Sequence, residues 1–240
     1  MNNLDTNNLN MDEENHITNI TMPTIAEVVL NEHKFGIRAA NIDEQRNSAS
    51  MLINKMYAWR GYSGNHQIRN EPNKITLTAS DKEGKTIGTL SLGLDSHLGL
   101  LADEGFKDCI DPYRKLGKVC EITKLAVSPE VKSKEILASL FHIAFLYARD
   151  IHQCTETFIE VNPRHQRFYK SILGFEIECE SRPNLRVDAP AVLLRMNSEY
   201  GTQKIAEGKI EKNHQDRSLF PYFFSKHEEA GIVQRLKNME

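Results

Sequence analysis

Apolar residues follow two different periods along this chain, and the first is the alternation typical of half-buried strands. Lys74–Ala79 (KITLTA) and Thr86–Leu94 (TIGTLSLGL) alternate in this way, and the turn residues Asp81–Gly84 between them predict a β-hairpin. A short apolar stretch, Ile25–Leu30, is expected to pack on the domain as an arm. Further strands are predicted over Lys34–Ala40, Lys118–Val127, Thr157–Val161, Phe175–Cys179 and Ala191–Met196.

The second period, an apolar residue every three to four positions, predicts helices. Asp43–Tyr57 shows this spacing, and Lys134–Arg149 carries a continuous apolar stripe. A third helix is predicted over Pro163–Leu173, because Asn162 before it is a favourable N-cap and Gly174 after it is a favourable C-terminal cap.

These elements predict one α/β domain with a mixed sheet and helices on both faces, in the order β-α-β-β-(α)-β-α-β-α-β-β. The bracketed helix lies in residues 95–117, where the pattern is ambiguous. Residues 1–22 are Asn-rich and poor in aromatics, and we expect a disordered tail. The domain is expected at 23–197. A C-terminal extension at 198–240 is expected to be helical, with its aromatic cluster Leu219–Phe224 docked on the domain rather than in a dimer contact.

Composition and charge narrow the class of protein. Apolar residues make up 40% and charged residues 26% of the chain, which is typical of a globular domain. The net charge of −3 gives no electrostatic basis for nucleic-acid binding. The sequence shows no signal-peptide pattern and no apolar run approaching about 18 residues. We therefore expect a cytoplasmic protein without a transmembrane segment.

Cysteine and histidine positions do not indicate a metal site or a redox motif. Cys109, Cys120, Cys154 and Cys179 contain no CxxC pair, so all four are expected to be small buried hydrophobes in a reducing compartment. The 9 histidines show no ligand spacing such as HExxH, and no bound metal is expected.

The most specific motif is Val161–Glu176, VNPRHQRFYKSILGFE. It resembles the strand–helix–strand block of the GCN5-related N-acyltransferases, in which Asn is followed by an FY pair and then by GF. The resemblance implies that fold, with a mixed and mostly antiparallel central sheet. It also implies a V-shaped splay between the strands Lys118–Val127 and Thr157–Val161, whose free edges can pair with a pantetheine arm. Tyr169 would protonate the departing thiolate; alternatively, Phe168 and Tyr169 are both core aromatics.

The second motif is the predicted strand KVCEITKLAV, which places two charges, Glu121 and Lys124, inside an apolar run. Simple alternation puts them on opposite faces of the sheet, so both reach one cleft only if a β-bulge shifts the phase. Glu121 would then act as general base on an amine, directly or through water, with a raised pKa from partial desolvation. Lys124 would orient Glu121 or bind the carboxylate of the acceptor. The alternative is a structural ion pair or an edge position.

A closer resemblance narrows the reaction. EITKLAV (Glu121–Val127) resembles the Glu-x-(Ser/Thr)-(Arg/Lys)-(Phe/Leu)-Ala-Val strand of the acyl-homoserine-lactone synthases and the N-acyl amino acid synthases. Ile37–Tyr62 and Val187–Met196 resemble the second group, and the likeness covers Phe35–Met196. It implies an N-acyltransferase that moves a long-chain acyl group from acyl carrier protein, or from acyl-CoA, to the amino group of an amino acid.

Three alternatives remain open. An acyl-homoserine-lactone-type synthase would use S-adenosylmethionine as the acceptor. The tryptophan and acidic positions expected after its first helix have no convincing match in this chain, in which Trp59 is the single tryptophan. The second is an acetyl-CoA-dependent N-acetyltransferase, and the third is a catalytically silent module that binds acyl carrier protein.

The thioester side of the site is expected to use residues from both motifs. In the implied mechanism, the backbone around Leu125, Ala126 and Val127 holds the oxyanion, and Asn162 belongs to the same thioester-binding set. The following segment, Ser128–Ile136, contains no glycine and is poorly suited to a tight N–H nest for a CoA diphosphate.

We expect Lys132 and Lys134 in that segment to bind the single phosphate of an acyl-phosphopantetheine thioester, although both could be merely solvated. Acyl carrier protein is acidic, so these lysines are expected to form a docking rim together with Arg164, Arg167 and Lys170. On the acceptor side, Arg38 and Arg46 could clamp a carboxylate, or could be ordinary surface residues.

Overall fold

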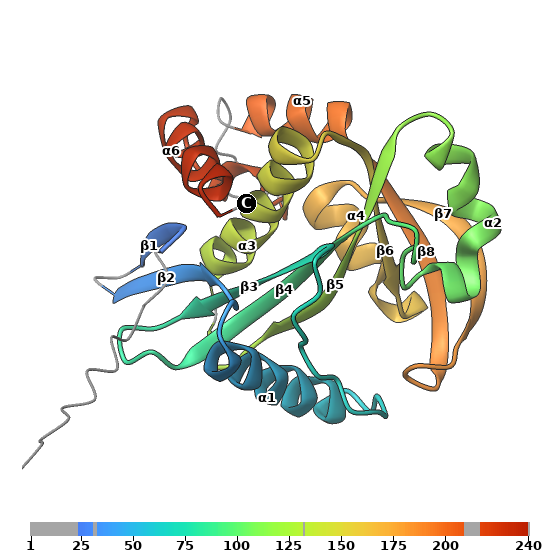
Figure 1. The fold of residues 1–240 in the computed structure, drawn as a ribbon, viewed down its shortest axis with the longest axis horizontal. Coiled ribbons are helices and arrows are strands. Elements are labelled where there is room, and N and C mark those ends of the chain that lie inside the picture. The colour runs from blue at the N-terminus through green and yellow to red at the C-terminus, as the bar shows by residue number, and fades with distance from the viewer. Residues whose placement is uncertain (1–23, 31–32, 132, 209–216, 240) are drawn as a thin grey trace, which may run out of the picture.

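The computed structural model describes residues 24–30, 33–131, 133–208 and 217–239. It contains one 8-stranded sheet in the order β1-β2-β3-β4-β5-β6-β8-β7, in which all neighbours are antiparallel except β5 and β6 (Figure 1). The strands are β1 (Ala26–Leu30), β2 (His33–Ala39), β3 (Lys74–Ser80), β4 (Thr86–Leu94), β5 (Lys118–Val127), β6 (Cys154–Val161), β7 (Glu176–Asn184) and β8 (Ala189–Asn197). The predicted tail at residues 1–22 lies outside the described residues.

Helices cover both faces of the sheet, as the sequence predicts. One face is covered by α1 (Asp43–Trp59) and α2 (Asp103–Arg114). The other face is covered by α3 (Lys134–Leu146), α4 (Gln166–Leu173), α5 (Ser198–Gly208) and α6 (Lys226–Lys237). In Figure 1, α3, α5 and α6 lie above the sheet and α1 lies below it. Three short helical turns complete the fold, η1 (Tyr147–Ile151), η2 (Pro163–His165) and η3 (Phe220–Tyr222).

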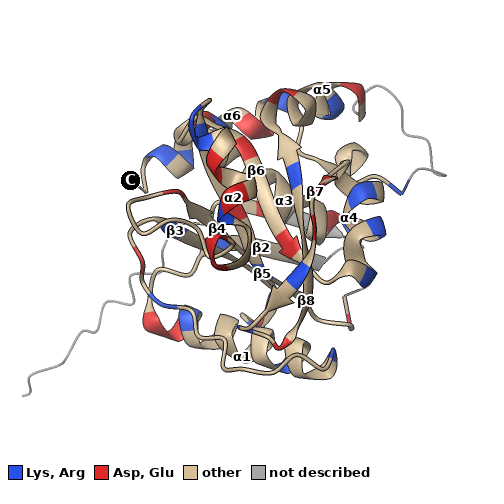
Figure 2. Cartoon of the chain, turned by 90° about the vertical axis from the view of Figure 1, so that its right-hand side faces the viewer, with Lys and Arg blue, Asp and Glu red and all other residues tan. Residues whose placement is uncertain are grey.

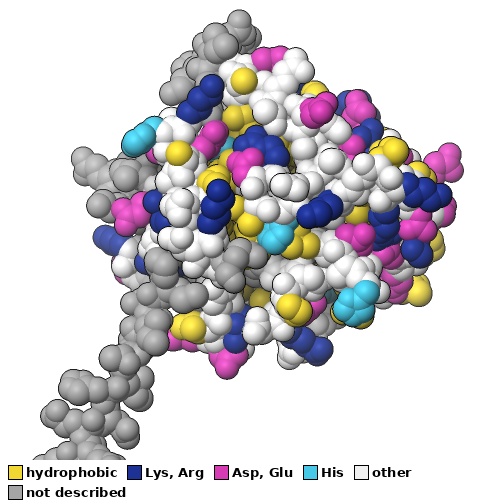
Figure 3. Space-filling view, turned by 45° about the horizontal axis from the view of Figure 1, so that its top comes forward, with side chains coloured by type: hydrophobic (Ala, Val, Ile, Leu, Met, Phe, Trp, Pro, Cys, Tyr) yellow, Lys and Arg dark blue, Asp and Glu magenta, His cyan; other side chains and the backbone are white. Residues whose placement is uncertain are grey.

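Most residues of α3 are buried, because this helix is covered on two sides. The sheet covers one side, and η3 with α6 covers the other. Four residues of the C-terminal aromatic cluster are buried there: Leu219, Phe220, Phe223 and Phe224. On the face shown in Figure 3, charged side chains of both signs are interspersed with apolar side chains, some of which lie in a central hollow and others singly on the surface.

Two irregularities next to each other in the sheet create the site. The β5–β6 pairing ends at Ile122 and Ile159, although β5 continues to Val127 and β6 to Val161. This is the predicted V-shaped splay. On its other edge, β5 carries a β-bulge, because Lys124 and Leu125 together lie opposite the single β4 residue between Thr89 and Ser91.

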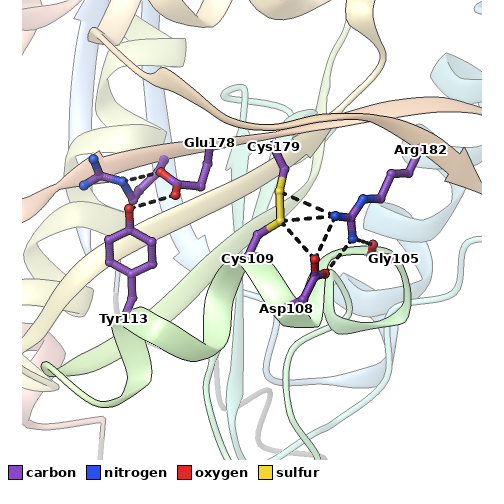
Figure 4. The surroundings of a disulfide bond; sticks show 8 residues. Gly105, Asp108, Cys109, Tyr113, Glu178, Cys179 and Arg182 are labelled. Carbon is purple, nitrogen blue, oxygen red and sulfur yellow. Dashed lines mark hydrogen bonds and ion pairs between the residues drawn. A yellow bond between two sulfur atoms is a disulfide. The ribbon is translucent and has the colours of Figure 1, made fainter.

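One sequence-based expectation is wrong, because the structure joins Cys109 of α2 to Cys179 of β7 in a disulfide. Their Cα atoms are 6.5 Å apart, within the range that a disulfide spans. The two lie 70 residues apart in the chain, so only the packing of α2 on β7 brings them together. Figure 4 shows the bond beside the ion pair of Asp108 and Arg182. Cys120 and Cys154 are buried thiols, as expected.

Candidate functional site

The splay between β5 and β6 opens into a cavity of about 1100 Å³. Its wall takes residues from both faces of the sheet. Met56 and Tyr57 come from the α1 side, whereas Leu137 and Tyr169 come from the α3 side. A cavity with two sides can hold two substrates that approach from opposite faces.

The β5 bulge brings Lys124 into this cavity. Its backbone adopts the left-handed conformation, with φ 55°, at a cost of about 1–3 kcal/mol for a residue other than glycine. The Thr89 hydroxyl donates a hydrogen bond of 2.8 Å to the Lys124 carbonyl and holds the bulge. Burial, with the nearby charges of Lys74 and Arg186, lowers the pKa of Lys124 to about 8. Lys124 therefore loses its proton at a lower pH than an ordinary lysine does.

His66 lies next to Lys124, with its Nδ1 3.3 Å from the Lys124 Nζ. Its Nε2 is 3.0 Å from the Ser63 carbonyl oxygen, which can only accept a hydrogen bond, so Nε2 carries the proton and Nδ1 is the acceptor. Burial, and then the charge of Lys124, lowers the pKa of His66 and favours this neutral form. His66 could not be predicted as a site residue from the sequence, because its contact with Lys124 depends on the bulge and no residue spacing reveals it.

Glu121 does not line the cavity. It is 3% exposed, and its Oε1 and Oε2 accept hydrogen bonds of 2.7 and 3.0 Å from the backbone N–H groups of Leu101 and Ala102. Burial raises the pKa of Glu121, and these two bonds oppose the shift. The carboxylate holds the start of α2 behind a wall to which Leu101 and Lys74 contribute. The structure thus separates Glu121 from the cavity that Lys124 enters.

Tyr169 of α4 lines the cavity and also packs on core aromatics. Its ring makes edge contacts with Phe168 at 5.2 Å and Phe175 at 6.4 Å between ring centroids. Burial raises the pKa of Tyr169 to about 12, so the hydroxyl keeps its proton at neutral pH. Both interpretations from the sequence are therefore compatible with its position.

The expected thioester-binding backbone also lies at the cavity. Leu125, Ala126 and Val127 line it, beyond the point where β5 leaves β6. Asn162 lines it too. Its side chain accepts a hydrogen bond from the Arg164 backbone N–H and donates another to the Pro190 carbonyl oxygen, so it caps η2 and ties it to β8.

Lys132, expected to bind the phosphate, lies outside the described residues. Lys134 is exposed at the start of α3, with its ammonium 5.3 Å from the centroid of the Tyr222 ring. Arg38 lies on β2, and Arg46 on α1 bonds to Asn41 and Asp43 at the start of that helix. Neither arginine is among the residues that line the cavity.

A second polar cluster on the cavity wall was not predicted from the sequence. Glu160 at the end of β6 accepts hydrogen bonds from Asn184 and Arg186 of the β7–β8 hairpin. Arg186 also binds Glu104 and the Leu101 carbonyl oxygen at the start of α2. Burial raises the pKa of Glu160, and the Arg186 charge opposes this. No local motif joins these residues, because they come from three separate elements.

Two further findings apply to the described part of the chain. No group of three or more His, Cys, Asp and Glu side chains there is placed to hold a metal ion. No helix there combines the length and apolar character needed to span a bilayer.

Comparisons with known proteins agree with this geometry. The profile of the family described as N-acyl amino acid synthase FeeM matches residues 48–197. No curated protein matches the sequence. Among solved structures, FeeM, an N-acyl amino acid synthase from uncultured soil microbes, is similar at TM-score 0.62 and 23% identity, over 71% of this chain and 95% of that chain.

Spermidine N-acetyltransferase from Vibrio cholerae, in complex with CoA and spermine, is similar at TM-score 0.51 and 12% identity, over 70% of this chain and 98% of the other. At such identities, the solved structures establish the fold, which is that of the GCN5-related N-acyltransferases. The family profile establishes more, because it matches over half of the sequence: the chain belongs to the N-acyl amino acid synthase FeeM family and is an N-acyltransferase.

Proposed function

We propose that this enzyme transfers a long-chain acyl group from acyl carrier protein, or from acyl-CoA, to the amino group of an amino acid in the cytoplasm. The observation that carries the proposal is Lys124, a half-buried cation inside the cavity. Its polar contact is the neutral His66, and no acidic side chain within the described residues forms an ion pair with it. A buried charge requires a counter-charge, which the carboxylate of an amino acid supplies.

The charge of the whole cavity supports an anionic acceptor. Its lining includes five cationic side chains, Arg60, Arg69, Lys74, Lys124 and Arg186. Among the described residues it includes two acidic side chains, Glu71 and Glu160, so this part of the lining has an excess of three positive charges. This field attracts carboxylates and repels polyamines such as the spermine bound by the Vibrio cholerae enzyme.

The free edge of β5 fits the donor. In the proposed reaction, a pantetheine arm pairs with this edge, and backbone N–H groups of Leu125–Val127 hold the thioester oxygen as charge develops on it. The amine attacks the carbonyl carbon, the C–S bond breaks, and Tyr169 gives its proton to the thiolate. Glu121 does not line the cavity, and both of its oxygens already accept hydrogen bonds behind its wall. A bridging water is therefore proposed to carry the amine proton to it.

A carrier protein as donor is supported by the basic positions on α4 and the turn before it, which Figure 2 shows in blue. Residues of both elements also line the cavity. Arg164, Arg167 and Lys170 are exposed there. Such a surface suits an acidic partner. Lys134 at the start of α3 extends the proposed docking rim.

The test is to incubate the purified enzyme with long-chain acyl carrier protein, long-chain acyl-CoA or acetyl-CoA, each with all common amino acids, and to identify products by mass spectrometry. We expect a long-chain N-acyl amino acid. Separate reactions offer S-adenosylmethionine or spermidine as the acceptor. A lactone from the former, or acetylation of the latter without any N-acyl amino acid, would overturn the proposal.

A further inference from the structure

His66 lines the cavity but takes no part in the proposed proton transfers. The residue is buried, yet it lies in the irregular segment between α1 and β3, where most side chains are exposed. Asn54 of α1 binds both polar groups of its backbone, accepting from the His66 N–H at 2.9 Å and donating to its carbonyl oxygen at 3.4 Å. The imidazole is therefore held from α1.

The segment also fits closely against the β7–β8 hairpin. Gly64 has φ 100°, a conformation that side chains rarely adopt. A Cβ there would lie 3.1 Å from the Arg186 carbonyl oxygen and 3.4 Å from the His66 ring. Glycine at position 64 therefore lets this segment lie close to the β7–β8 hairpin. This close approach brings His66 to the cavity.

The hydrogen bonds of the His66 ring determine which of its nitrogens donates and which accepts. Nε2–H donates to the Ser63 carbonyl oxygen, so Nδ1 presents a lone pair to the Lys124 ammonium. Tyr57 packs against the ring edge-on at 4.7 Å between centroids and keeps it in place. We propose that His66 is a positioning residue, which holds the Lys124 ammonium in the cavity so that it binds the carboxylate of the acceptor amino acid.

A neutral hydrogen-bond acceptor is suited to holding the Lys124 ammonium, whereas a carboxylate is not. An acidic partner would neutralise Lys124 and compete with the substrate carboxylate, but an imidazole orients the ammonium and leaves its charge available. Lys74 is an example of a lysine with an acidic partner, because its ammonium forms an ion pair with the Glu71 carboxylate at 2.8 Å. Other titratable or charged groups that face the pair are Tyr57, Lys74, Glu71 and Arg186.

The inference rests on the proposed function, and a double-mutant cycle tests it. His66→Phe keeps a ring against Tyr57 but removes the acceptor, and His66→Asn keeps an acceptor near the place of Nδ1. We expect His66→Phe to raise the KM of the acceptor about 3- to 10-fold, the range for loss of one hydrogen bond. The KM of the acyl donor should stay within about twofold, and His66→Asn should recover part of the loss.

In a Lys124→Met background, His66→Phe should change the acceptor KM by less than about twofold, because the residue acts through Lys124. An equal increase in both backgrounds would overturn the proposal, and so would a loss confined to kcat. Circular dichroism and thermal melting of each variant separate these effects from misfolding.

A second measurement does not depend on activity. Reductive ¹³C-methylation and NMR titration give the pKa of Lys124, identified by loss of its signal in Lys124→Arg. His66→Phe removes the hydrogen-bond acceptor and should lower the pKa of Lys124 further. His66→Asn keeps an acceptor and should leave this pKa near the wild-type value. An unchanged pKa in His66→Phe would overturn the contact. If that pKa shifts but the wild type acylates no amino acid, the contact stands and the proposed function fails.

Discussion

Lys124 shows how one residue links backbone geometry to binding. Its left-handed backbone belongs to the β5 bulge, which brings its ammonium into the cavity beside His66. Burial provides the second property, a pKa lowered to about 8. Burial removes the Lys124 ammonium from water and so strengthens its interaction with a carboxylate. Burial also lowers the pKa of Lys124 toward physiological pH.

Acceptor binding should therefore weaken above about pH 8. The Lys124 ammonium is charged below its lowered pKa of about 8 and neutral above it, whereas an ordinary lysine stays charged to about pH 10. The measurement is the inhibition constant of the 2-hydroxy acid that matches the accepted amino acid, because this analogue has no amine to titrate. We expect Lys124→Arg to keep binding at pH 9 and Lys124→Met to weaken it about 10- to 100-fold at pH 7. A flat profile in the wild type would contradict the role.

Glu121→Gln should affect stability as well as turnover. In glutamine an NH2 group replaces one of the two carboxylate oxygens, so the backbone N–H of either Leu101 or Ala102 faces a donor instead of an acceptor and loses its partner. We expect a loss of about 1–3 kcal/mol in urea unfolding, with lower turnover and little change in thioester binding. Unchanged turnover would remove Glu121 from the mechanism, and unchanged stability would contradict its bond to α2.

At the scale of elements, α2 and the β7–β8 hairpin form one wall of the site. The Cys109–Cys179 disulfide and the Asp108–Arg182 ion pair join them at one end. Arg186 joins them again next to the cavity through its bond to the Leu101 carbonyl oxygen. The wall is therefore fastened by covalent and polar contacts between segments that are distant in sequence.

Breaking the disulfide should destabilise this wall. For the Cys109→Ala/Cys179→Ala variant we expect a loss of about 2–4 kcal/mol in the free energy of unfolding, because the crosslink closes a loop of 70 residues in the unfolded chain. Equilibrium urea unfolding without reductant measures this loss. The control is Cys120→Ala, whose thiol is not crosslinked. Alkylation and intact-mass analysis of the wild type should show two blocked cysteines, and four reactive thiols under denaturing, non-reducing conditions would contradict the bond.

At the scale of the whole molecule, the C-terminal helices complete the core. Ile232 and Leu236 of α6 are 1% and 0% exposed and belong to the same apolar cluster as α3. The helix begins at a capping box formed by Ser225 and Glu228. The layer over α3 is thus part of the folded unit, although it lies beyond the segment that the family profile matches.

Leu236→Ala should cost about 2–5 kcal/mol, as for other fully buried leucines, and should lower the melting temperature. The matched control is Lys237→Ala, which changes an exposed neighbour in the same last turn. Differential scanning calorimetry measures both. Equal melting temperatures for the two variants would show that α6 does not contribute to the core.

The sequence by itself determined the order of strands and helices from β2 to β8, with α2 left ambiguous, and the capped turn at Asn162, because these features depend on local periodicity and on neighbouring residues. Ala26–Leu30, expected only as an arm, instead forms β1 and pairs with β2. Tertiary structure alone decided which side chains meet. The register of β4 on β5 places the bulge at Lys124, so Lys124 reaches the cavity and His66 while Glu121 stays behind the wall. Register and bulges depend on pairing between distant segments, as does the Cys109–Cys179 contact, and no local pattern records that pairing.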